Sequence, residues 1–131
     1  QYDNPLVILL RDGKNYDYEK TAMEIGGKTI YKSKIKLQEN DKILYLAVAE
    51  PESTMVLQSQ KNYFLRFATE DIPEKKKGAV GVRGMRMTDG ELLTAVWQLT
   101  GEEEQIIMIK EKAVHLNRLR IANRDTRGVK K

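Results

Sequence analysis

One short pattern occurs three times along the chain, the third time only in its apolar part, and it limits the possible folds more than any other feature. Residues 8–10 and 14–16 (ILL and KNY) recur 47 residues later as 55–57 and 61–63 (MVL and KNY). The apolar part returns after a further 51 residues as 106–108 (IIM). Repeats of about 40 to 50 residues that hold several strands are typical of propeller blades. One blade cannot bury both of its faces, so neighbouring blades must stack.

The apolar runs between the turn signals are short and rich in β-branched residues, which favours strands over helices. We expect strands at 7–10, 29–37, 42–49, 54–59, 63–67, 92–99, 105–109 and 113–117. The segment 68–73 is expected to form one helical turn with Thr69 as its N-cap. The core is expected from 7–10, 43–48, 55–57, 92–96 and 106–109. The prediction is one all-β repeat domain over 1–131, with repeats at about 5–53, 54–103 and an incomplete 104–131.

The composition excludes several kinds of site. Cysteine is absent, which excludes disulfides, thiol nucleophiles and zinc–cysteine centres. The single histidine, His115, has no acidic residue at the neighbouring alternate positions, so we expect a structural or surface role for it. No apolar run approaches the roughly 20 residues of a membrane span. We therefore expect no catalytic residue, metal or cofactor, and, because the chain starts without Met, a fragment of a larger protein.

The charges fall in blocks along the chain. The net charge is +4, but residues 56–86 carry +4, residues 87–104 carry −5 and residues 105–131 carry +6. This pattern predicts a basic face with the acidic segment 87–104 turned away from it. A basic face indicates a polyanionic partner, most often nucleic acid.

The segment 73–86 (PEKKKGAVGVRGMR) combines clustered cations with regularly spaced glycines. Glycines allow a loop to bring its backbone N–H groups close to an anion, and lysine and arginine supply the charge. The segment lacks the Lys-Ser/Thr of a nucleotide-binding P-loop. It suits contact with a phosphate backbone. The alternatives are a protein-interaction scaffold, or a basic turn that only protects an edge strand from pairing.

Residues 63–91 resemble a repeat of the C-terminal domain of the A subunit of bacterial DNA gyrase and topoisomerase IV. The matching features follow one another in the family's order. They are Arg66-Phe67, Pro73, the basic loop Lys75–Gly78, the motif Gly81–Gly84 and the acidic turn Asp89–Glu91. The segment 124–130 (RDTRGVK) is similar to the same loop in the following repeat, and 24–43 to a degenerate one.

This resemblance implies part of a β-pinwheel, a disc of four-stranded antiparallel blades that exchange strands with their neighbours. Its basic rim would bind and bend duplex DNA without sequence specificity. The parent would be an ATP-dependent, bacterial, cytoplasmic and nucleoid-associated topoisomerase. Its cleavage chemistry would belong to other parts of the A subunit. ATP and Mg would also belong elsewhere in the parent enzyme, with ATP hydrolysis in the B subunit. The alternative remains a propeller-like scaffold with no nucleic-acid role.

The residues expected to contact DNA lie in two loops that should form one continuous track. They are Lys75, Lys76, Lys77, Gly78, Gly81, Arg83, Arg86, Arg124, Arg127 and Lys130. In the gyrase family the corresponding loop, called the gyrase box, reads Gln, two basic residues, Gly-Gly, a basic residue and Gly. The aligned loop 75–81 (KKKGAVG) lacks the Gln, the second Gly and the last basic residue. The sequence therefore leaves gyrase and topoisomerase IV equally open.

Overall fold

Antiparallel strands make up almost all of the regular structure in the computed structural model, which describes residues 6–10, 14–16, 20–25, 28–33, 43–72, 82–101 and 104–131. The strands are β1 (Leu6–Leu10), β2 (Lys14–Tyr16), β3 (Lys20–Ile25), β4 (Lys28–Ser33), β5 (Ile43–Val48), β6 (Thr54–Ser59), β7 (Tyr63–Ala68), β8 (Val82–Arg83), β9 (Leu93–Leu99), β10 (Ile106–Ile109), β11 (Lys112–His115), β12 (Ile121–Ala122) and β13 (Val129–Lys130). Two 3-10 turns, η1 (Thr69–Asp71) and η2 (Leu116–Arg118), are the only helical elements in this part of the chain. The predicted all-β class is confirmed.

The strands form two blades whose outer strands come from later in the sequence. The first blade has the order β5-β1-β2-β8, and the second has β9-β6-β7 with β12 and β13 both paired to β7. Strand β8 follows β6 and β7 in the sequence yet completes the first blade. Likewise, β13 follows the β10–β11 hairpin yet completes the second. The predicted exchange of strands between pinwheel blades is therefore present, with β12 as one short parallel addition.

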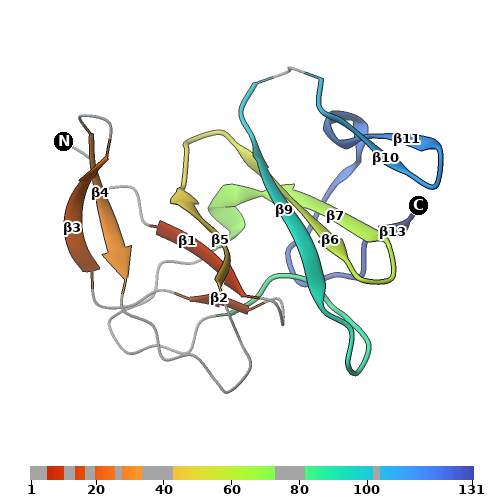
Figure 1. Ribbon diagram of the computed structural model, residues 1–131, viewed down its shortest axis with the longest axis horizontal. Coiled ribbons are helices and arrows are strands. Elements are labelled where there is room, and N and C mark those ends of the chain that lie inside the picture. Colours follow the sequence, from red (N-terminus) through yellow and green to blue (C-terminus); the bar gives the residue numbers. More distant parts are fainter. Residues whose placement is uncertain are drawn as a thin grey trace.

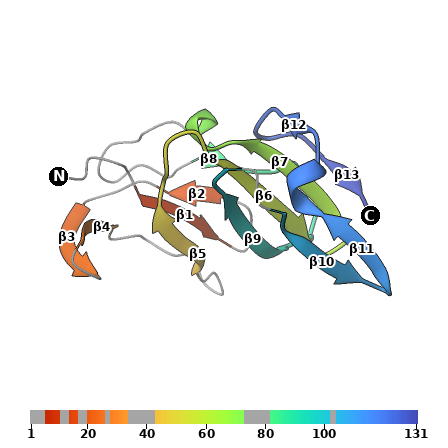
Figure 2. The same cartoon turned by 90° about the horizontal axis from the view of Figure 1, so that it is seen from above.

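In Figure 1 the first blade, the second blade and the β10–β11 hairpin follow one another from left to right. Strands β5 and β9 are neighbours between the first and second blades, and the β10–β11 hairpin packs beyond the second blade. The same order is seen from above in Figure 2, where β3 and β4 form a separate hairpin at the end of the molecule opposite β11.

Two positions with left-handed backbone explain why asparagine and glycine stand where they do. Asn62 of the KNY triplet has φ 63°, a left-handed conformation that asparagine tolerates better than most residues, in the turn between β6 and β7. Gly128 has φ 80°, and a Cβ there would collide with the carbonyl oxygen of Phe64. A glycine before Val129 therefore lets β13 approach the edge of β7.

The sheet of the second blade is buried on both faces, as its uninterrupted apolar runs require. One face carries Met55, Leu57, Leu65 and Phe67, which pack with Met85 and Leu93. The other face carries Val56, Phe64 and Leu99, which pack with Val114, Leu116 and Leu119 of the third repeat. The prediction of a core at 55–57 is confirmed.

Two sequence expectations about the core and the helical turn were wrong. Ile106 and Met108 are 47% and 64% exposed, because the two-stranded β10–β11 hairpin packs only the face that carries Ile107 and Ile109. The N-cap of η1 is Ala68, without a side-chain hydrogen bond, whereas the hydroxyl of Thr69 accepts a hydrogen bond from that of Ser53. The side chains of 6–10 lie outside the described part of the structure.

Candidate nucleic-acid interface

Two arginine-rich loops lie side by side at the outer strands of the two blades. The loop 84–92 follows β8, and the 124–128 loop precedes β13. The backbone N–H of Arg86 donates to the carbonyl of Thr126 at 2.9 Å, and the N–H of Asp125 donates to the carbonyl of Gly84 at 2.9 Å. Because β8 and β13 occupy the same place in successive blades, loops far apart in sequence become neighbours. The structure thus brings together Arg83 and Arg86 with Arg124 and Arg127.

Arg83 forms an ion pair across the two loops. Its Nε lies 2.6 Å from Oδ1 of Asp125, and its Nη2 lies 3.1 Å from Oδ2. The hydrogen bonds and charge of Asp125 raise the pKa of Arg83 above its usual value. The side chain is 58% exposed, but a two-pronged contact with a carboxylate offsets much of its charge.

Arg124 ties three segments together through backbone carbonyls. Its Nε donates to the carbonyl of Asp71 in η1 at 3.0 Å, and its Nη1 donates to the carbonyl of Arg83 at 2.6 Å. The side chain is half-buried. These contacts anchor the 124–128 loop to the end of β7 and to β8.

Arg127 lies at the centre of the interface and has an acidic partner. Its Nη2 lies 3.1 Å from Oε1 of Glu91, and its guanidinium carbon lies 3.5 Å from the centre of the Tyr63 ring. The Glu91 side chain is fully buried. Burial by itself raises the pKa of Glu91, but hydrogen bonds from Ser59, Thr88 and Arg127 outweigh it and lower the pKa to about 2.

The expectation that the acidic segment 87–104 turns away from the basic loops is therefore wrong for Glu91. The carboxylate pairs with Arg127 because Glu91 lies in the connection from β8 to β9, which is hydrogen-bonded through its backbone to the 124–128 loop. Charge blocks counted along the chain do not reveal this, since the partner comes from a different repeat.

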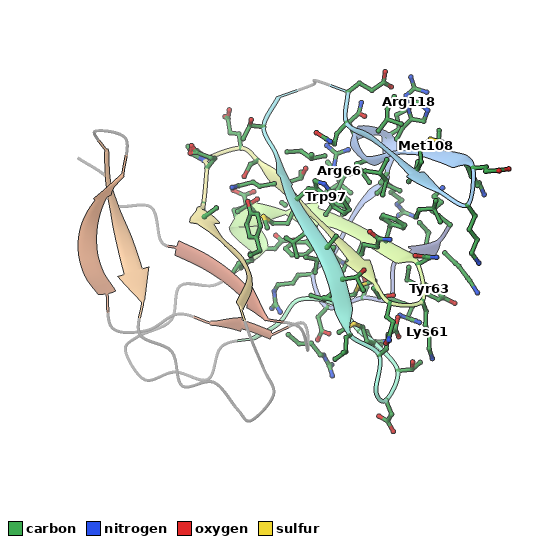
Figure 3. The ribbon with its side chains drawn as sticks, viewed as in Figure 1. Lys61, Tyr63, Arg66, Trp97, Met108 and Arg118 are labelled. Atoms are coloured by element: carbon green, nitrogen blue, oxygen red, sulfur yellow. The ribbon has the colours of Figure 1, made fainter. Side chains whose placement is uncertain are left out.

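Two cations of the predicted set have side chains that could bind a phosphate without first leaving a carboxylate. Arg86 and Lys130 are exposed, and neither side chain has a hydrogen bond or ion pair with any residue that the structure describes. Lys130 pairs with Tyr63 in the β13–β7 register. Lys61, in the turn just before Tyr63 (Figure 3), is also exposed, and its Nζ donates to Oγ1 of Thr88 at 2.7 Å.

Lys61 was not among the residues expected to contact DNA. The signal that could have found it is the recurring KNY triplet, which places a lysine next to a turn at the end of a hairpin. The predicted contacts Lys75, Lys76, Lys77, Gly78 and Gly81 lie outside the described residues, so they stay predictions.

A second group of charges lies at the opposite end of the second blade from Lys61 (Figure 3). Oε1 of Glu104 lies 3.0 Å from Nδ1 of His115 and 2.7 Å from Nη2 of Arg118. The acidic neighbour of His115 thus comes from before β10, whereas the sequence search covered only the adjacent positions of its own strand. The contact is at the surface, and Arg118 is 66% exposed.

The described residues contain no group of three or more histidine, aspartate or glutamate side chains placed to hold a metal ion. Within the same part of the chain, no helix is long and apolar enough to cross a membrane.

The middle of the chain matches a model of a known protein family. Residues 54–96, from β6 to the middle of β9, match the family model for the DNA gyrase C-terminal domain, beta-propeller. The predicted resemblance to the gyrase A C-terminal domain family is confirmed. The A subunit of DNA gyrase from Escherichia coli (strain K12) is 23% identical over 132 aligned residues, which cover 97% of this chain and 15% of that protein.

Solved structures of similar fold align with nearly the whole chain. The C-terminal domain of DNA topoisomerase IV has a TM-score of 0.75 at 19% identity, covering 98% of this chain and 41% of that one. The ParC C-terminal domain of E. coli has a TM-score of 0.70 at 15% identity, covering all of this chain and 57% of that one. These likenesses show the fold. The chain spans about half the length of each of these structures, and a small part of the full-length gyrase protein.

Proposed function

We propose that the chain binds and bends duplex DNA, without sequence specificity, as the C-terminal domain of a gyrase or topoisomerase IV A subunit. The observation that carries the proposal is the pair of hydrogen-bonded loops at the outer strands, which presents Arg86 and Lys130 to solvent. Membership of the gyrase-type fold supports the same role. The parent enzyme would use the bound DNA in ATP-dependent supercoiling or decatenation.

The kind of contact follows from the elements that carry the cations. Reading base edges in the major groove requires a helix or a two-stranded ribbon that enters it. The two cations assigned to the contact lie instead on a loop, for Arg86, and on the short edge strand β13, for Lys130, and the described helical elements are turns of three residues. Such a surface suits contacts to phosphates, which position a duplex without reading its sequence.

The proposal assigns the chemistry to other parts of the parent enzyme. DNA cleavage would belong to the rest of the A subunit, whereas the B subunit would carry ATP hydrolysis with its Mg. The parent would then act in the bacterial cytoplasm, at the nucleoid. In this arrangement the chain needs no cofactor and performs no reaction of its own.

The test is a fluorescence-anisotropy titration of a long duplex at several salt concentrations. Each phosphate contact contributes about 0.9 to the slope of log K against log salt. Replacing Lys75, Lys76 and Lys77 together with Ala should flatten the slope by up to about 2.7, equally for all DNA sequences. The variant with both Arg86→Gln and Lys130→Gln should flatten it by up to about 1.8.

Two controls separate phosphate contact from a general change of charge. Arg118→Gln removes one cation that already pairs with Glu104 at the other end of the blade, so the slope should not change. Replacing 102–104 (three Glu) with Gln should leave the affinity unchanged or slightly raised. If the lysine and Arg86/Lys130 variants keep the slope of the unmutated chain, these loops are not the contact. A protein-interaction scaffold would then be the better explanation.

A further inference from the structure

Arg127 joins the two basic loops from a half-buried position, and its partners define its role. We infer that Arg127 is a positioning residue, which holds Arg86 in place for a phosphate and does not itself contact DNA. The inference rests on the proposed function and divides the predicted DNA-binding residues into two groups, those that contact phosphate and those that place the contacts.

The guanidinium of Arg127 is already occupied. Nη1 lies 3.2 Å from Oε2 of Glu91 and 3.2 Å from the carbonyl oxygen of Arg86, and Nη2 lies 3.1 Å from Oε1 of Glu91. The ring of Tyr63 covers the guanidinium at 3.5 Å, and the side chain is only 27% exposed. Its charge faces a fully buried carboxylate. A phosphate at this point would have to compete with Glu91 for the same donors.

The same contacts fix the backbone of Arg86 from both sides. The N–H of Arg86 donates to the carbonyl of Thr126, and the carbonyl of Arg86 accepts from Arg127. The Arg86 side chain is exposed and has no partner among the described residues. A cation carried on a fixed backbone loses less conformational freedom when it binds a phosphate than one on a mobile loop. Arg127 therefore acts on DNA binding through Arg86.

Arg127→Lys separates the two roles, because it keeps the charge and changes the geometry. Lysine binds phosphate well as a point charge, but it cannot hold two acceptors in a planar fork. If Arg127 positions Arg86, Arg127→Lys should flatten the salt slope by about 0.9, as much as Arg86→Gln does. If Arg127 contacts phosphate directly, Arg127→Lys should keep the slope of the unmutated chain, and the inference is overturned.

The double variants give an independent answer. Arg127→Lys added to Arg86→Gln should change the slope no further, because the contact that Arg127 places is already absent. With Arg127→Gln and Arg86→Gln combined, a total flattening of about 1.8 would mean two separate phosphate contacts, which also overturns the inference. A lower Tm for Arg127→Lys with unchanged DNA binding would show a purely structural role and refute it as well.

The experiment distinguishes this inference from the proposed function. If the unmutated 131-residue chain does not bind duplex DNA, the proposed function fails and the inference fails with it. If the unmutated chain binds with a steep salt slope and Arg127→Lys behaves like it, only the inference fails. Arg118→Lys is the matched control, since it makes the same substitution at an exposed ion pair far from the loops.

Discussion

Glu91→Gln tests the buried charge on which the loop arrangement depends. The substitution keeps the size of the side chain but removes its negative charge and the two-pronged contact with Arg127. The carboxylate is fully buried, so no water can replace the lost hydrogen bonds. We expect a large loss of stability at neutral pH, together with a characteristic pH dependence.

The magnitude follows from the pKa of Glu91. Its reduction from 4.5 to about 2 corresponds to roughly 3 kcal/mol, at about 1.4 kcal/mol for each pH unit. Removing one partner of a fully buried ion pair costs about 3–5 kcal/mol, but Arg127 is partly exposed and can turn toward water. We therefore expect Glu91→Gln to lower the free energy of unfolding at pH 7 by about 2–3 kcal/mol.

The pH dependence has a definite sign. A carboxyl group whose pKa is lower in the folded state contributes its full stability above the unfolded pKa, and loses it as the pH falls through the folded one. The unmutated chain should therefore lose the contribution of Glu91 between pH 4.5 and about 2. The difference in stability between the unmutated chain and Glu91→Gln should shrink over the same range.

Urea unfolding at a series of pH values, followed by the fluorescence of Trp97, measures this difference. Trp97 is the single tryptophan and packs against the buried cluster that contains Val56 and Phe64, so its signal reports loss of the fold. Glu104→Gln is the matched control, because Glu104 is 42% exposed, and its ion pairs should contribute less than about 1 kcal/mol. A difference between unmutated and Glu91→Gln chains that stays constant from pH 7 to about 2.5 would refute the reasoning.

Three further predictions concern the fold. Gly128→Ala should lower Tm clearly, because the new Cβ would collide with the backbone of Phe64. Gly101→Ala is the control, since Gly101 has a similar φ and open space around it, and its backbone strain should lower the free energy of unfolding by only about 1 kcal/mol. Phe64→Ala should lower the free energy of unfolding by about 3–5 kcal/mol, and Met108→Ala, at a 64% exposed position, by less than about 0.5 kcal/mol; equal losses in urea unfolding would contradict the assigned core. Ser53→Ala removes a buried hydroxyl whose single proton lies within hydrogen-bond distance of three acceptors, the carbonyl of Glu50, Oγ1 of Thr69 and Oε1 of Gln98. The substitution should cost about 1–3 kcal/mol by thermal unfolding; an unchanged Tm would contradict this.

Much of the local structure could be predicted from the sequence, because it depends on neighbouring residues. Strand β6 has the predicted bounds 54–59, and the other apolar runs whose structure is described form strands with ends that differ by a few residues. The helical turn expected within 68–73 is present as η1. The second KNY triplet lies at the turn of the β6–β7 hairpin, where Asn62 supplies the left-handed conformation that the turn needs.

The residue types of the candidate interface could also be predicted from the sequence, but its electrostatics could not. The sequence alone determined that the chain is all-β, that it is built from repeated hairpins, and that arginines gather around β8 and before β13. Only the tertiary structure decided that Arg127 pairs with Glu91 and Arg83 with Asp125, while Arg86 and Lys130 face solvent. The physical reason is that strand propensity and turn geometry act between adjacent residues. The effective charge of a side chain depends instead on the partner that a distant segment brings within about 4 Å.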